Sequence, residues 1–109
     1  MNPPKNKDLK WLAWDFDNCI AQNTGHPHFK ITKPVKGAKE ALWYAVEKGW
    51  KIVIHTARPW SDYHAIESWM IKKEFPFNKI VCGKLLAHFY IDDRAIEFKG
   101  DWKNVIDQL

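Results

Sequence analysis

The chain has 109 residues, 46% of them hydrophobic, which suits one domain with a small core and is too apolar for an intrinsically disordered chain. No apolar run approaches the roughly 20 residues that cross a bilayer, so the sequence predicts no membrane span. We expect a flexible polar leader at residues 1–8 and a single domain at residues 9–109. The two widely separated cysteines, Cys19 and Cys82, are expected to stay reduced, which favours a cytoplasmic protein.

Basic side chains gather between residues 23 and 39, where no Asp or Glu occurs, in a chain whose net charge is +4. They are His26, His28, Lys30, Lys33, Lys36 and Lys39. Such a segment is either an ordinary solvated surface or a surface that attracts a phosphorylated ligand or a nucleic acid. The sequence leaves both interpretations open.

Two aspartates follow the first predicted strand directly. Residues 11–14 form a short apolar run, typical of a buried strand, and Asp15 and Asp17 come immediately after it. Two carboxylates at the end of a buried strand favour a nearby cation, and oxygen ligands of this kind suit Mg²⁺. The alternative for such a pair is a solvated loop or a helix cap without metal.

The middle of the chain predicts a flap, a helix and a strand. Residues 18–32 show no regular period, so we expect a turn followed by a flap or hairpin. Apolar residues at one-face helical spacing predict a helix over 38–46, which Gly49 is placed to end. Residues 50–56 are β-branched and apolar, and they predict a second strand.

The rest of the chain predicts two more helices and two more strands. A helix begins near residue 60 and stops before Pro76, because the residue before proline avoids the helical region. Residues 80–82 predict a third strand and residues 88–91 a fourth. A last helix is expected after Asp101, which is placed to cap it.

Strands that alternate with helices predict parallel crossovers and a three-layer α/β/α sandwich with a Rossmann-like sheet. In such sheets ligands bind beyond the carboxyl ends of the strands. The polar side chains that follow the predicted strands are Asp15, Asp17, Thr56, Arg58, Lys84, Asp92 and Asp93. Each of these residues, taken alone, has an ordinary structural interpretation, such as a solvated lysine or aspartates paired with Arg94. Their joint arrangement favours a functional site.

This order resembles the haloacid dehalogenase superfamily of phosphohydrolases over nearly the whole chain. The matching motifs are Asp15-Phe-Asp17, the Thr56 that ends Ile-Val-Ile-His-Thr, Lys84, and Tyr-Ile-Asp92-Asp93. Between Asp17 and Thr56 there is room only for a flap and one helix, so the chain is similar to the small capless phage and bacterial members.

The resemblance implies a Mg²⁺-dependent phosphatase that works through an aspartyl-phosphate. Asp15 is then the nucleophile, and Asp17 is the general acid and base, with its backbone carbonyl also on the metal. Thr56 and Lys84 are expected to bind the phosphoryl group and offset its charge. The pair Asp92-Asp93 is expected to complete the metal site, as direct or outer ligands.

Two positions depart from the family pattern. Asn18 stands where glycine is usual, and asparagine tolerates the left-handed backbone that such a turn needs. Cys19 stands where threonine or valine is usual and keeps a small, half-buried side chain there. Neither change removes a catalytic group.

An open site without a cap suits a large substrate. We expect Arg58 to contact phosphate or substrate, His26 and Lys30 on the flap to bind substrate, and Phe29 to stack on a base. These features favour a nucleotide or polynucleotide phosphate over a sugar phosphate. His55, inside the second predicted strand, is interpreted as a core histidine.

Three alternatives to the phosphatase remain at this stage. One is a non-catalytic module of the same fold that binds Mg²⁺ or phosphate. Another is a basic nucleic-acid-binding protein, whose binding depends steeply on salt and ignores both Mg²⁺ and Asp15. A phosphoacceptor receiver domain fits poorly, because its acceptor aspartate belongs on the third strand, where this chain has Cys82.

Overall fold

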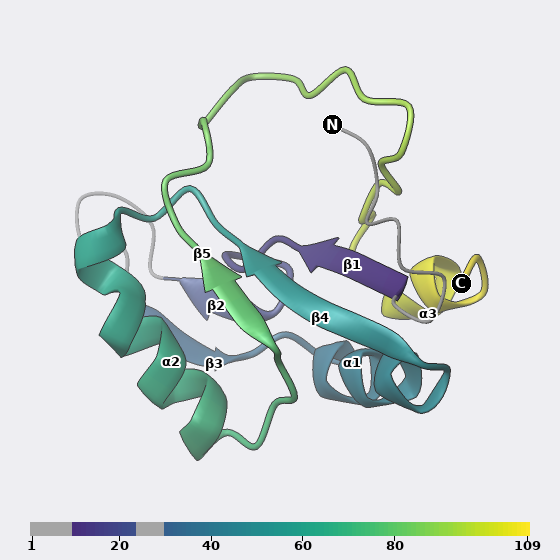
Figure 1. The fold of residues 1–109 in the computed structure, drawn as a ribbon, viewed down its shortest axis with the longest axis horizontal. Helices are drawn as coiled ribbons and strands as arrows, with labels where there is room; N and C mark the ends of the chain where they lie inside the picture. The colour runs from purple at the N-terminus through teal and green to yellow at the C-terminus, as the bar shows by residue number, and fades with distance from the viewer. Residues whose placement is uncertain (1–9, 24–29) are drawn as a thin grey trace.

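A three-stranded parallel sheet lies at the centre of the fold. The computed structural model describes residues 10–23 and 30–109, so the predicted leader at residues 1–8 lies outside them. Strands β1 (Lys10–Trp14), β4 (Trp50–His55) and β5 (Lys79–Val81) pair in the order β1-β4-β5 (Figure 1). Lys10 lies opposite Trp50, and Trp14 lies opposite Ile54. The first three predicted strands and their parallel pairing are therefore confirmed.

An antiparallel hairpin follows β1. Its strands are β2 (Ala21–Asn23) and β3 (Ile31–Pro34), and the Thr32 hydroxyl donates to the Gln22 carbonyl at 2.8 Å. The predicted flap or hairpin is thus confirmed in its two strands. Residues 24–29 between them, which include His26 and Phe29, lie outside the described part of the chain.

Helices connect the parallel strands. α1 (Ala38–Glu47) leads into β4 and packs against it, with one buried face as its spacing predicts. The chain then turns at Gly49, whose φ of 91° is left-handed and suits glycine. A 3₁₀ turn, η1 (Trp60–Asp62), leads into α2 (Tyr63–Lys72), which ends ahead of Pro76. None of the helices in the described ranges is long and apolar enough to cross a membrane.

The short C-terminal helix α3 (Trp102–Ile106) packs against α1. The Asp101 carboxylate accepts from the Lys103 backbone N–H at 2.9 Å, which confirms the predicted cap. The ring of Trp102 lies 4.8 Å from that of Trp14, and its indole N–H donates to the Cys19 carbonyl at 2.8 Å. The last helix therefore supports the turn that follows β1.

The core is built from the inner faces of these elements. Its fully buried large side chains are Phe16, Ile20, Leu42, Ile52, Ile54, Ile66 and Met70. Each such side chain contributes on the order of 1.5–3 kcal/mol by leaving water. Because Phe16 belongs to this set, the backbone between the two aspartates is anchored in the core.

The prediction of a fourth strand over residues 88–91 is wrong. Residues 84–100 contain neither strand nor helix and run as a wide loop from β5 to α3 (Figure 1). Phe89 is 87% exposed and Ile91 is fully exposed. The apolar run favours extended backbone but does not supply a pairing partner. Here the Tyr90 hydroxyl binds the Leu85 carbonyl and the Ala87 backbone N–H, which bends the segment back on itself.

Candidate functional site

Three loops meet beyond the carboxyl ends of the parallel strands. Asp15 and Asp17 follow β1, Thr56 and Arg58 follow β4, and Lys84 follows β5. The Thr56 backbone N–H donates to the Val81 carbonyl at 2.9 Å, and the Lys84 N–H donates to the Thr56 carbonyl at 3.0 Å. These bonds hold the second and third loops together. The structure therefore brings most of the predicted site residues to one edge of the sheet.

The aspartates are placed by a tight turn. The Phe16 carbonyl accepts from the backbone N–H groups of residues 19, 20 and 21, at 3.3, 2.9 and 3.1 Å. Asn18 has a φ of 60°, the left-handed conformation expected of it from the sequence. The Phe16 N–H also donates to a carboxylate oxygen of Asp15 at 2.9 Å. The turn thereby fixes where Asp15 points.

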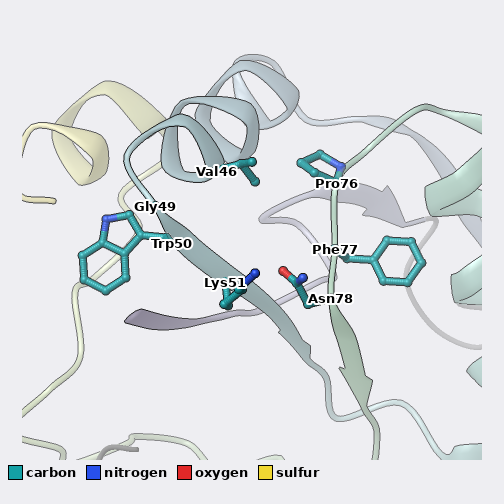
Figure 2. Close-up of a pocket in the computed structure, with 7 residues that line it drawn as sticks. All are labelled: Val46, Gly49, Trp50, Lys51, Pro76, Phe77 and Asn78. Atoms are coloured by element: carbon teal, nitrogen blue, oxygen red, sulfur yellow. The ribbon is translucent and has the colours of Figure 1, made fainter. Parts of the chain in front are cut away.

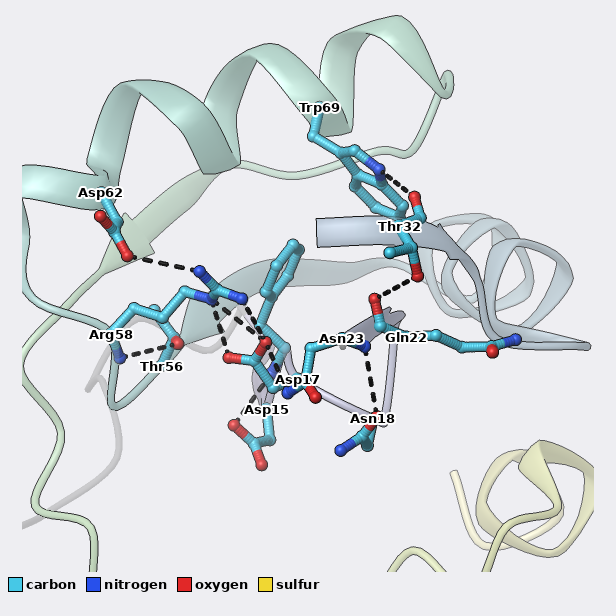
Figure 3. Close-up of polar contacts among 11 residues, drawn as sticks. Asp15, Asp17, Asn18, Gln22, Asn23, Thr32, Thr56, Arg58, Asp62 and Trp69 are labelled. Carbon is cyan, nitrogen blue, oxygen red and sulfur yellow. Dashed lines mark hydrogen bonds and ion pairs between the residues drawn. The ribbon is translucent and has the colours of Figure 1, made fainter. Parts of the chain in front are cut away.

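Asp17 and Arg58 form a close ion pair (Figure 3). Arg58 Nε lies 3.1 Å from Asp17 Oδ1 and 2.9 Å from Oδ2, and Nη2 lies 2.7 Å from Oδ1. A fourth contact joins Arg58 Nη1 to Asp62 at 3.3 Å. Only 10% of the Arg58 side chain is exposed, against 26% for Asp17. This is the geometry in which a guanidinium binds a carboxylate most firmly.

Burial by itself lowers the pKa of Arg58, but hydrogen bonds and charges from Asp17 and Asp62 outweigh it and raise that pKa above its ordinary value. The Arg58 backbone N–H donates to the Thr56 hydroxyl oxygen at 3.1 Å. Thr56 is fully buried, and it is the only buried polar side chain in the part of the chain that the structure describes. Thr56 and Arg58 thus hold each other in place.

Asp15 has a different environment from Asp17. It forms no salt bridge with any of the described residues, and although it is exposed as a residue, its carboxylate is partly desolvated by the surrounding protein. This desolvation raises the pKa of Asp15, and the nearby charge of Asp17 raises it further. The positive charge of Lys84 and the Phe16 N–H act in the opposite direction without cancelling the rise. Asp15 is therefore a carboxylate whose charge a nearby cation would stabilise.

Two further residues lie close to Asp15. The Cys19 thiol is 4.0 Å from Asp15 Oδ2; burial and that charge raise its pKa to about 12, so it stays protonated. His55 is half-buried rather than a core residue, so the prediction for it is wrong. Burial lowers the pKa of His55, Lys84 lowers it further and Asp15 raises it. The sequence feature that places His55 near Asp15 is its position one residue before Thr56, at the end of the strand.

The structure does not bring Asp92 and Asp93 to this site. Both are exposed in the loop over residues 84–100, and Asp92 accepts from the Arg94 backbone N–H at 2.8 Å. Because no strand forms at 88–91, nothing carries these carboxylates to the edge of the sheet. Among the described residues, no three His, Cys, Asp or Glu side chains are grouped to hold a metal ion. The metal-ligand role of the pair stays a prediction.

Two hollows border the sheet. One, of about 260 Å³, lies at the amino ends of β4 and β5 and contains no predicted site residue (Figure 2). The other, of about 510 Å³, lies beside Arg58 at the carboxyl ends. It is lined by Lys30, Ile31, Arg58, Asp62, Ala65 and Trp69. Two of the predicted substrate-binding residues, Lys30 and Arg58, thus share one hollow, whereas His26 lies outside the described residues.

No protein-family model and no curated protein matches this chain. Among solved structures, the chain is similar to a crystal structure of a structural genomics target from Vibrio cholerae, with a TM-score of 0.66. The two sequences are 24% identical, and the match covers 92% of this chain and 98% of the other. The likeness is one of fold. It supports a mixed α/β architecture with a parallel sheet.

Proposed function

We propose that this protein is a Mg²⁺-dependent phosphohydrolase that forms an aspartyl-phosphate on Asp15. The observation that carries the proposal is the contrast between two neighbouring carboxylates at one strand end. Asp17 is neutralised by Arg58, whereas Asp15 has a raised pKa and no salt bridge to any described residue. Groups that differ in this way suit different chemical roles in one site.

The carboxylate of Asp15 suits nucleophilic attack on a phosphate ester. One of its oxygens forms a bond to phosphorus while the bond between phosphorus and the ester oxygen breaks. Water then attacks the same phosphorus, and inorganic phosphate and free Asp15 are released. The Phe16 N–H, at 2.9 Å from Asp15 Oδ1, orients the carboxylate for the first step.

Asp17 transfers protons in this proposal. It gives a proton to the leaving ester oxygen and later takes one from the attacking water. Asp17 is held by Arg58 at 2.7–3.1 Å, so it must leave the guanidinium and take up a proton from water before it acts as an acid. An incoming phosphate competes for the same guanidinium. We therefore place phosphate binding at Arg58 before proton transfer at Asp17.

The residues present fit a hard cation at Asp15. The carboxylate is an oxygen donor whose pKa is raised chiefly by desolvation, so a bound cation would stabilise its ionised form, and the Asp17 backbone carbonyl is the second expected donor. When bound, Mg²⁺ would offset the negative charge of the carboxylates and of the phosphoryl oxygens. Lys84, whose charge already acts on Asp15, would share that role.

The finer fold assignment belongs to the same proposal. We infer a capless Rossmann-like α/β/α sandwich of the haloacid dehalogenase type. The strand order β1-β4-β5 supports it, since β4 lies in the centre and the site residues follow successive strands. The short hairpin of β2 and β3 supports the absence of a cap in the described chain.

The test is phosphate release with and without Mg²⁺. The substrates are phenyl phosphate, nucleoside monophosphates, and oligonucleotides phosphorylated at either end. Asp15→Asn keeps the size and the bond to Phe16, and Asp107→Asn on the exposed C-terminal turn is the matched control. We expect Mg²⁺-dependent release that is lost in the first variant and kept in the second. Release that survives Asp15→Asn contradicts the mechanism.

A second candidate function is a non-catalytic module of the same fold. The observation that favours it is the close pairing of Asp17 with Arg58, which keeps the expected general acid bound to a guanidinium. Such a protein binds Mg²⁺ and phosphate analogues but releases no phosphate from any substrate. Calorimetric titration of the folded protein with both ligands distinguishes it from the enzyme.

A further inference from the structure

The lining of the hollow beside Arg58 combines apolar and charged residues. The apolar ones are Ile31 from β3 and Ala65 and Trp69 from α2. The charged ones are Arg58, Lys30 and Asp62. Its volume, about 510 Å³, lies within the range of about 300–1,000 Å³ that holds small organic ligands. The hollow is open to solvent, and its lining offers apolar contacts and positive charge to a molecule with an apolar part and an anionic part.

Trp69 is held rigidly in the lining of the hollow. Its indole N–H donates to the Thr32 carbonyl at 2.8 Å, its ring meets Phe16 edge-on at 5.5 Å, and it stacks on Phe75 at 5.3 Å. An aromatic face fixed in this way favours flat rings, because stacking then costs little side-chain ordering. The hydrogen bond also ties α2 to the hairpin across the hollow.

Arg58 joins the hollow to the proposed reaction centre. Arg58 lines the hollow and at the same time binds Asp17, so a ligand in the hollow lies next to the aspartate pair. In Figure 3, Asp62 and Trp69 lie along one helical segment, with Arg58 and Asp17 on the side that it faces. Lys30 adds positive charge at the hairpin end of the hollow. A phosphate group is favoured beside Arg58 and the organic part of the ester beside Trp69.

We propose that this hollow binds the leaving group of the ester and selects phosphate monoesters with a flat aromatic group, such as a nucleobase or an aryl ring. The inference rests on the proposed function, because it names the part of the substrate that departs. It adds Trp69 and Ala65 as residues that determine specificity. Neither takes part in the chemical step.

The test uses phosphonates, which the enzyme does not hydrolyse. Phenylphosphonate and methylphosphonate carry the same anionic group, and only the first has a ring. We expect phenylphosphonate to bind about tenfold more tightly, because burying part of a ring removes apolar area from water. We also expect the ¹⁵N indole signal of Trp69 to shift with phenylphosphonate and not with methylphosphonate. Calorimetry gives the two affinities and NMR gives the signal.

Ala65→Phe fills the hollow from an exposed helical position. This variant should bring the ratio of phenylphosphonate affinity to methylphosphonate affinity close to one and leave the methylphosphonate affinity unchanged. Ile71→Phe is the matched control, since Ile71 is 62% exposed on the same helix, away from the Ala65–Trp69 face. The affinity of a nucleoside monophosphate for the Asp15→Asn variant shows whether the hollow prefers a nucleobase or a simple aryl group. Tighter binding of either ligand than of methylphosphonate supports the proposal.

Equal affinities in the unmodified protein, or a preference that survives Ala65→Phe, overturn the proposal. The result is independent of turnover, because phosphonates report binding alone. If the ring preference is present and no ester is hydrolysed, the proposed function fails and the binding hollow stands. If esters are hydrolysed without a ring preference, the proposed function stands and this inference fails.

Discussion

The ion pair between Asp17 and Arg58 should contribute several times more to the free energy of unfolding than an ordinary surface ion pair. In Arg58→Met the side chain keeps much of its length and loses its charge. The Asp17 carboxylate then loses its three contacts with Arg58, at 2.7–3.1 Å, and keeps the hydrogen bond from the Asn23 side-chain amide, at 3.2 Å. Removing one partner of a fully buried pair costs about 3–5 kcal/mol. Because 26% of the Asp17 side chain faces water, we expect about 2 kcal/mol here.

A loss of about 2 kcal/mol lowers the Tm of a domain of this size by about 8 °C. Urea and thermal unfolding of Arg58→Met, Asp17→Asn and the double variant measure the loss and the coupling between the two residues. The double variant should be less destabilised than the sum of the two single variants, by about 1 kcal/mol or more. Lys103→Met is the control, because its partner Asp107 is 61% exposed, and it should cost less than about 0.5 kcal/mol. A coupling close to zero refutes the reasoning.

Three further predictions follow from other described positions. In the folded protein the pKa of Asp15 is raised above its ordinary value of 3.8. Ionisation of Asp15 therefore destabilises the folded protein as the pH rises from 3.8 through the raised folded pKa. Asp15→Asn should be more stable than the unmodified protein at pH 7 without metal, and Mg²⁺ should raise the Tm of the unmodified protein only. Asn18 has a left-handed φ of 60°, so Asn18→Val should lose about 1–2 kcal/mol in urea unfolding whereas Asn18→Gly should be nearly neutral. Ile54 is fully buried on the central strand, so Ile54→Ala should cost about 2–5 kcal/mol in the same measurement.

Local sequence patterns predicted the elements whose partners are close in the chain or strongly apolar. The run 11–14, the run 50–56 and the one-face spacing over 38–46 each became the expected element. The turn at Asn18 was also predictable, because few residues other than glycine tolerate its backbone. These features depend on the residue types themselves.

The remainder depends on contacts that a local pattern does not contain. Residues 88–91 have the composition of a strand but pair with none of the described strands. Instead the Tyr90 hydroxyl donates to the Leu85 carbonyl and accepts from the Ala87 backbone N–H. The polar ends of the strands predicted that Asp17 and Arg58 share a site. Which of two aspartates the guanidinium binds was set by the packing of the β4 loop, 41 residues further along the chain. The hollow beside Trp69 requires β3 and α2 to lie together, which no pattern in either segment indicates.

The bond between the Trp102 indole and the Cys19 carbonyl has a consequence for biosynthesis. The two residues are 83 positions apart in the chain. At about 5–20 residues per second, the ribosome makes Trp102 on the order of 4–17 s after Cys19. Throughout that interval the nascent aspartate turn lacks its support from α3. The carboxyl edge of the sheet therefore takes its final shape late in synthesis, after the strands that carry it have been made.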